Sequence, residues 1–208
     1  MKTRLGCFIL LMSLLTLTAA AQSRPSSEQA FQVTSSTFQN NGTLPLSTLS
    51  NIIVNDLNVC SLNGSPGGNQ SPELSWSNAP SGTKSFVVVA YDVTAAFTHW
   101  GMYNISASAT GLPENAGVSG SIFGTQIIND FFVGAEYDGP CPPMGVEPTV
   151  HHYVFTVYAL DKTLKLPSSA NFPANAETLY QGLIDVGAAG HILGTAKIVG
   201  LYSTTPSK

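Results

Sequence analysis

Two long apolar runs restrict the fold of this chain more than any other feature. "SFVVVAYD" (85–92) and "HHYVFTVYAL" (151–160) are rich in β-branched and aromatic residues. Such runs are typical of strands inside a sheet, and the near-continuous 85–92 run predicts a strand buried on both faces. Further strands are predicted, between segments rich in turn residues, at 31–38, 72–77, 99–105 and 196–203. Residues 46–72 are expected to form a long surface connection.

Only one helix is predicted, and it lies late in the chain. It is expected to begin at Asn175 or Ala176, because apolar residues recur at helical spacing from Leu179 to Val186, and Gly187 is expected to end it. Strands and helices do not alternate along the sequence. The pattern therefore predicts a mainly β fold with antiparallel strands and one C-terminal helix.

Residues 1–21 have the pattern of a secretory signal peptide, in which a short basic segment precedes the apolar run 8–17 and cleavage is expected after Ala21. An N-terminal membrane anchor is the alternative, but the run is shorter than the roughly 20 residues that span a bilayer. We expect a secreted or periplasmic protein without a transmembrane segment in the mature chain. In that chain a flexible segment, 22–30, precedes a single domain, 31–208.

The mature chain is expected to be acidic. The full chain has 8 basic and 12 acidic residues, and loss of Lys2 and Arg4 leaves 8 − 2 = 6 basic residues and a net charge of −6. Nucleic-acid-binding domains carry a basic patch, and peripheral proteins of anionic membranes carry a polybasic cluster. Neither is present, so nucleic acid is excluded as a partner.

Two cysteines, Cys60 and Cys141, remain after cleavage. Because disulfides persist in oxidising compartments, we predict that these two residues are bonded to each other. Two buried free thiols are the alternative that the sequence leaves open.

Three ionisable residues stand at the ends of predicted strands: Asp92, His99 and His151. Each has an ordinary structural explanation, since Asp commonly caps a turn and a histidine is often half-exposed at a strand end. Together, beside the stiff loop "YDGPCPPMGVEPTVHHY" (137–153), they suggest one pocket. Neighbouring strand residues point to opposite faces, so only one of His151 and His152 can enter it.

No catalytic motif accompanies these residues. The sequence contains no G-x-S-x-G elbow, G-x-G-x-x-G turn, P-loop or H-E-x-x-H motif. Aspartate and histidine are ligand types that zinc accepts, but no nucleophile lies beside a base at a recognisable spacing. We therefore expect a protein that is not an enzyme and has no cofactor and no metal.

At these residues the sequence resembles the phosphatidylethanolamine-binding protein family, and in particular its bacterial, Raf-kinase-inhibitor-like branch. The resemblance extends from about Phe31 to the end of the chain. The matching segments occur in the family's order: "SPELSWSNAPSGTKSFVVVAYD" (71–92), "HWGMYNI" (99–105), "LPENAG" (112–117), "YDGPCPPMG" (137–145), "HHYVFTVYALD" (151–161) and "GHILGTAKIVGLY" (190–202).

This resemblance implies a central antiparallel sheet packed on a smaller sheet, a C-terminal helix and a shallow anion-binding pocket. The implied ligand is a small anionic or phosphorylated molecule, with a phospholipid head group as one candidate. Relatives are also described as inhibitors of kinases or proteases, so a protein-interaction module with a protein partner is the alternative function. The pocket residues implied by the family motifs are Asp92, His99, Gly139, Pro142, Pro143, His151 and Tyr153.

Physical chemistry assigns expected roles to the loop residues. Pro142 and Pro143 have fixed φ and form a stiff wall, whereas Gly139 permits close approach of the backbone to a ligand. The backbone N–H of Cys141 is a candidate donor to a bound oxyanion.

The ionisable residues are expected to work together. Protonated His99 and His151 would donate charge-assisted hydrogen bonds to an anion, and Asp92 would orient one of the two rings. The sequence departs from the family at "DVTAA" (92–96), where D-P-D-A-P is usual, and at His152, where the family has arginine. These departures are expected to change the identity of the bound ligand more than they change the fold.

Overall fold

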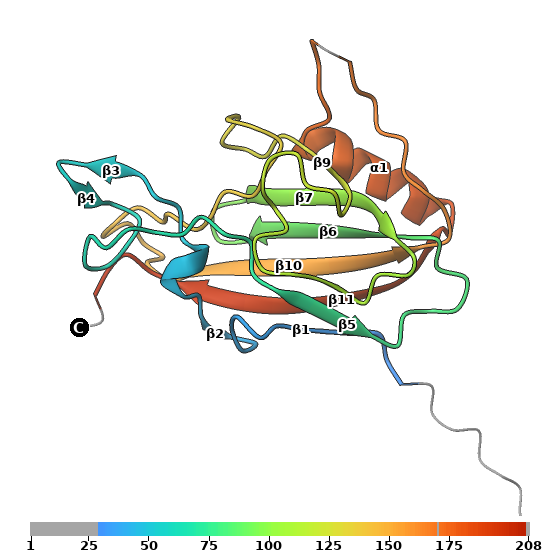
Figure 1. Ribbon diagram of the computed structural model, residues 1–208, viewed down its shortest axis with the longest axis horizontal. Coiled ribbons are helices and arrows are strands. Elements are labelled where there is room, and N and C mark those ends of the chain that lie inside the picture. Colours follow the sequence, from blue (N-terminus) through green and yellow to red (C-terminus); the bar gives the residue numbers. More distant parts are fainter. Residues whose placement is uncertain (1–28, 170, 207–208) are drawn as a thin grey trace, which may run out of the picture.

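The computed structural model describes residues 29–169 and 171–206, so the predicted signal peptide and residues 22–28 lie outside the described part. Its main element is a six-stranded sheet with the order β2–β11–β10–β6–β7–β9 (Figure 1). All neighbours in it are antiparallel except β11 and β2, which are parallel. The strands are β2 (Gly42–Thr43), β6 (Ser85–Asp92), β7 (Phe97–Ser106), β9 (Thr125–Gln126), β10 (His151–Leu160) and β11 (Ile192–Tyr202).

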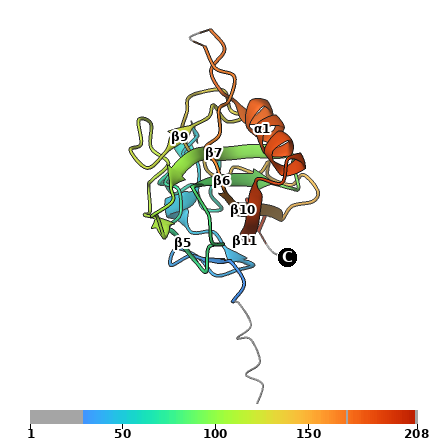
Figure 2. The ribbon, with the colours of Figure 1, turned by 90° about the vertical axis from the view of Figure 1, so that its right-hand side faces the viewer.

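A smaller sheet of β1 (Gln32–Thr34), β5 (Leu74–Ser77) and β8 (Gly111–Leu112) covers one face of the main sheet. The helix α1 (Ala176–Ala188) covers the opposite face (Figure 2). Because strand side chains alternate, Phe86 and Val88 pack in the core that contains Trp76, whereas Val87 packs in the core that contains Leu179. As predicted, β6 is buried on both faces.

The ends of α1 follow from its sequence. The Asn175 side chain accepts a hydrogen bond from the backbone N–H of Thr178, and the Thr178 hydroxyl accepts one from the N–H of Asn175. The prediction that Gly187 ends the helix is wrong, because the helix continues to Ala188. The left-handed backbone that stops it occurs at Gly190, with φ of +76°.

The segment 46–72 is more ordered than the predicted connection. It contains the 3₁₀ turn η1 (Leu46–Thr48) and a hairpin of β3 (Ile53–Val54) and β4 (Leu57–Asn58), which projects beyond one end of the main sheet (Figure 1). In the described part of the chain, no helix is long and apolar enough to span a membrane.

Four predicted strands differ in length from the observed ones, and β5 begins at Leu74 where the sequence predicted 72. β7 is longer than predicted, and β11 starts earlier, at Ile192. β1 covers only Gln32–Thr34, because the polar residues after it bind Glu73 instead of a partner strand. The Ser36 N–H donates to the Glu73 carboxylate at 2.6 Å, and the Ser35 hydroxyl donates to the Glu73 carbonyl at 2.5 Å.

Candidate ligand-binding site

A pocket of about 190 Å³ lies at one end of the main sheet. Asp92 is the last residue of β6 at this end of the sheet. Because β7 and β10 run antiparallel to β6, their first residues, including His99 and His151, lie at the same end. The loop after β9 supplies the remaining wall. The lining residues are Asp92, Ala95, Phe97, His99, Phe131, Cys141, Pro142, Pro143, His151 and Tyr153.

A β-bulge in β7 turns His99 into the pocket. Ala90 pairs with Trp100 and Tyr91 with Thr98, so His99 is the extra residue between two pairs. The Thr98 hydroxyl lies 3.5 Å from the Tyr180 hydroxyl on the α1 side, whereas Trp100 packs in the core on the opposite side. In a regular strand the side chains of Thr98 and Trp100 would point to the same face of the sheet and His99 to the opposite face. Because of the bulge, Thr98 points to the α1 side, whereas His99 and Trp100 both point to the opposite side.

Asp92 uses its two carboxylate oxygens for different purposes. Oδ1 accepts hydrogen bonds from the backbone N–H groups of Thr94 at 2.8 Å and Ala95 at 3.2 Å, which hold the turn after β6. Oδ2 lies 2.5 Å from Nδ1 of His151, and both side chains are almost fully buried. Turn capping and orientation of a pocket histidine, which the sequence offered as alternatives, are therefore combined in one side chain. His152, on the opposite face of β10, is exposed.

His99 is held in a defined tautomer. Its Nδ1 lies 2.7 Å from the carbonyl oxygen of Asp138, and a carbonyl only accepts, so Nδ1 carries a hydrogen. Burial lowers the pKa of His99, against the opposing effects of that hydrogen bond and the carboxylates of Asp92, Asp138 and Asp130. The ring is therefore neutral near pH 7, and its Nε2 is an acceptor. This revises the expectation that His99 donates as an imidazolium.

Aromatic rings surround His99. Its ring centroid lies 5.1 Å from Phe97, 5.6 Å from Phe131 and 5.2 Å from Tyr153. Burial, together with the negative charge of Asp92, raises the pKa of Tyr153 far above its usual value, so its hydroxyl stays neutral. Sequence reasoning did not identify Phe97 and Phe131, since neither lies in a motif, although Phe97 begins a strand at the predicted pocket edge.

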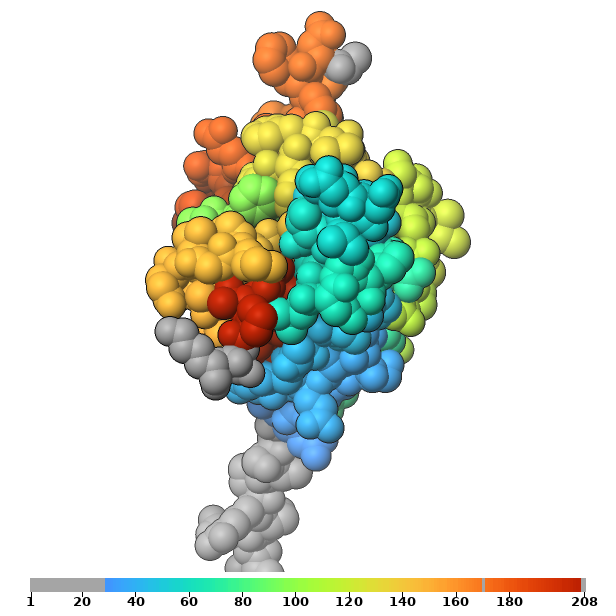
Figure 3. Space-filling view, turned by 90° about the vertical axis from the view of Figure 1, so that its left-hand side faces the viewer, coloured from blue at the N-terminus to red at the C-terminus, as the bar shows by residue number. Residues whose placement is uncertain are grey.

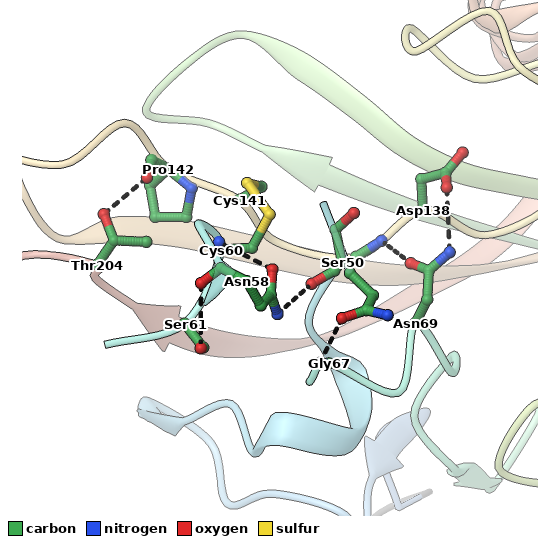
Figure 4. Close-up of a disulfide and its surroundings, with 12 residues drawn as sticks. Ser50, Asn58, Cys60, Ser61, Gly67, Asn69, Asp138, Cys141, Pro142 and Thr204 are labelled. Carbon is green, nitrogen blue, oxygen red and sulfur yellow. Dashed lines mark hydrogen bonds between the residues drawn. A yellow bond between two sulfur atoms is a disulfide. The ribbon is translucent and has the colours of Figure 1, made fainter. Parts of the chain in front are cut away.

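The proline loop is anchored on several sides (Figure 4). Cys60 and Cys141 form a disulfide with a Cα–Cα distance of 4.3 Å, in agreement with the predicted pairing. The Thr204 hydroxyl donates to the Pro142 carbonyl at 2.7 Å. The Asn69 side chain donates a hydrogen bond to the Asp138 carboxylate at 3.1 Å. Its amide oxygen accepts one from the backbone N–H of Gly139 at 2.7 Å. The wall of the pocket is therefore preformed.

Gly139 does not line the pocket, contrary to the expectation from the sequence. A Cβ at this position would collide with the backbone carbonyl of Thr48 and come within 2.6 Å of the backbone nitrogen of Ser50. The glycine is needed for close approach, but to the protein's own η1 segment and not to a ligand. The other expected pocket residues line one cavity.

A wider hollow of about 540 Å³ lies between the loop before β10 on one side and β2 and the segment after β4 on the other, with residues 201–206 at its base (Figure 3). Among the described residues that line it, Glu147 is the only charged one, and its carboxylate does not attract an anion. Within residues 29–169 and 171–206, no group of three or more His, Cys, Asp or Glu side chains is arranged to hold a metal ion.

The sheet order, the single helix and this pocket define a protein class. The sequence profile described as phosphatidylethanolamine-binding protein matches residues 34–203, and the chain belongs to this family. The family expected from the sequence motifs is therefore confirmed.

Relatives come from several organisms. The chain is 41% identical over 153 residues to the UPF0098 protein YbcL of Escherichia coli K12, covering 68% of this chain and 74% of YbcL. It is 38% identical over 141 residues to a UPF0098 protein of Methanothermobacter thermautotrophicus, covering 65% and 84% of the two chains. The crystal structure of E. coli YbcL superposes with a TM-score of 0.65 at 33% identity, over 84% of this chain and 99% of YbcL.

Proposed function

We propose that the protein binds a small anionic group, such as a phosphate or a phospholipid head group, in the pocket between Asp92, His99 and His151. The observation that carries the proposal is the 2.5 Å contact between Asp92 and His151 in a small pocket with a preformed wall. Asp92 accepts from Nδ1 of His151, so a protonated ring directs its Nε2–H elsewhere, and that hydrogen suits an oxyanion. The N–H of Cys141 remains the second expected donor.

We also propose that this is a binding protein and not an enzyme, and that it works outside the cytoplasm. The N-terminal sequence supports export, and the Cys60–Cys141 disulfide fits an oxidising compartment. The pocket holds no nucleophile beside a base in the described residues, since Asp92 is the acceptor of His151 and is engaged by its own turn.

Calorimetric titration with methyl phosphate tests the proposed binding. Affinity should be higher at pH 6 than at pH 8, because a protonated imidazole attracts an anion and the lower pH favours the protonated form. His151→Ala should abolish binding, whereas His152→Ala, a change on the exposed face of the same strand, should not. Binding that survives His151→Ala unchanged would refute the proposal.

A second candidate function, a protein-interaction module that regulates a kinase or a protease, is favoured by a separate observation. Apolar side chains are exposed on the β3–β4 hairpin and the adjoining loops, and three of them line a hollow that shares Cys141, Pro142 and Pro143 with the pocket. This apolar tip consists of Ile53, Val54, Leu57, Leu62 and Met144, each 49–63% exposed. A stable complex with a protein from the same compartment, formed equally by wild type and His151→Ala but lost in Leu57→Asp, would support this second function over the first.

A further inference from the structure

The two histidines of the pocket differ in what they offer a ligand. Nδ1 of His151 faces an acceptor, the Asp92 carboxylate, and Nδ1 of His99 faces another acceptor, the Asp138 carbonyl. Each ring therefore has its Nδ1 hydrogen fixed, and only Nε2 remains to meet a ligand. Whether each Nε2 donates or accepts then depends only on whether the ring carries a second proton.

Both Nε2 atoms are open to the cavity. Neither has a hydrogen-bond partner in the described part of the chain. In that same part, every fully buried side-chain nitrogen or oxygen atom has a partner. The two Nε2 atoms are therefore not fully buried, and both residues line the same pocket, so the pocket is where a ligand reaches them.

The surroundings of the two rings separate their charge states. His151 contacts a carboxylate directly at 2.5 Å, an arrangement that suits an imidazolium. His99 is 5% exposed, is enclosed by the rings of Phe97, Phe131 and Tyr153, and makes its hydrogen bond to a neutral carbonyl. The carboxylates of Asp92, Asp130 and Asp138 favour a charged ring, but burial outweighs them.

We propose that the pocket selects a ligand that accepts a hydrogen bond from Nε2–H of His151 and at the same time donates one to Nε2 of His99. The singly protonated form of a phosphate monoester has this combination, because it carries one P–O–H group and two unprotonated oxygens. A sulfate monoester has the same single charge but no hydrogen to donate, and the same holds for a phosphodiester, including the head group of an intact phospholipid, so the inference narrows the proposed ligands to phosphate monoesters. This inference rests on the proposed anion binding and names the ligand class of that site.

The affinity of the site therefore depends on whether the ligand carries this proton. A phosphate monoester loses its second proton at about pH 6. At pH 8 all of its terminal oxygens are therefore hydrogen-bond acceptors, and none can donate to His99. An unprotonated phosphate oxygen and Nε2 of neutral His99 are both acceptors, so no hydrogen bond forms between them. Binding then leaves Nε2 of His99 without a partner, which costs free energy. His99 is thus a specificity-determining residue.

Methyl phosphate and methyl sulfate form a matched pair of probes for this inference. At pH 6 much of the methyl phosphate is a monoanion of nearly the same size and charge as methyl sulfate, and the two differ by one hydroxyl hydrogen. Calorimetry with the full mature protein should give methyl phosphate a roughly tenfold higher affinity at pH 6, because methyl sulfate leaves the His99 acceptor unpaired. At pH 8 that preference should disappear.

Variants and spectroscopy assign the preference to His99. His99→Phe should abolish the preference at pH 6, whereas His152→Ala should retain it. Nitrogen-15 NMR of wild-type imidazole groups gives a readout that needs no folded variant: His99 should be the neutral tautomer with hydrogen on Nδ1. An Nε2–H tautomer, equal affinities for the two probes at pH 6, or a preference that persists in His99→Phe would overturn the inference alone. No binding of either probe would overturn the proposed function with it.

Discussion

Replacement of Asp92 separates the two tasks that its carboxylate performs. Asp92→Ala removes the acceptor of two backbone N–H groups in the turn after β6 and of Nδ1 of His151. Each turn hydrogen bond contributes about 1 kcal/mol, and a buried donor left without a partner costs about 1–3 kcal/mol. We therefore expect Asp92→Ala to lower the free energy of unfolding by roughly 3–5 kcal/mol.

Asp92→Asn should be much milder. An amide oxygen can still accept from the N–H groups of Thr94 and Ala95, whereas the amide NH₂ then faces Nδ1 of His151. That ring can respond by moving its hydrogen to Nε2 and accepting at Nδ1, so we expect a loss of only about 1 kcal/mol in stability. Binding should suffer more, because a protonated His151 no longer has an anionic partner, and a neutral donor binds an anion more weakly, here by about tenfold.

Urea unfolding at pH 7 and calorimetry with methyl phosphate at pH 6 measure the two effects. Asp92→Ala and Asp92→Asn should differ clearly in stability, and Asp92→Asn should be a folded protein with impaired binding. Equal destabilisation by the two substitutions would refute the separate roles of the two oxygens. Wild-type affinity in Asp92→Asn would refute the role of the Asp92–His151 pair in binding.

The remaining predictions concern the disulfide, the buried histidine and the loop glycine. Reduction of Cys60–Cys141, which closes a separation of 81 residues, should lower stability by roughly 2–4 kcal/mol, and an unchanged melting temperature in reductant would contradict this. Because the folded state keeps His99 neutral where the unfolded chain protonates it, stability should fall as the pH drops below about 6.5. Urea unfolding at pH 7, 6 and 5 should show a shallower decline in His99→Phe than in wild type, and parallel declines would contradict the assignment. Gly139→Ala should cost about 1–3 kcal/mol, since its Cβ meets the Thr48 backbone, and a stability equal to that of wild type would show that the loop packs differently.

The sequence predicted the strands whose composition leaves little choice. The bounds of β6 and β10 match the apolar runs 85–92 and 151–160, because a long β-branched and aromatic run is stable only inside a sheet. The length of β1 was overestimated, because the alternation of residues 31–38 does not show that the polar residues after Thr34 form hydrogen bonds with Glu73. Side-chain competition for backbone groups is a tertiary effect that local patterns do not contain.

The candidate site was predictable in its residues but not in its chemistry. The positions of Asp92, His99 and His151 at the ends of predicted strands, together with the family motifs, predicted one pocket, and all three residues line one cavity in the structure. The different donor and acceptor roles of the two histidines were not predictable, because they depend on a bulge in β7 and on the Asp138 carbonyl, which lies 39 residues from His99 in sequence. Phe131 entered the pocket from a loop that no motif marked.

The most direct test of anion binding is a crystal structure of the mature protein grown with methyl phosphate at pH 6. We predict a phosphate in the pocket within about 2.6–3.2 Å of Nε2 of both His99 and His151, with its methyl group directed toward the opening. An empty pocket at a saturating concentration, or a phosphate bound only in the wider hollow beside Glu147, would contradict the account.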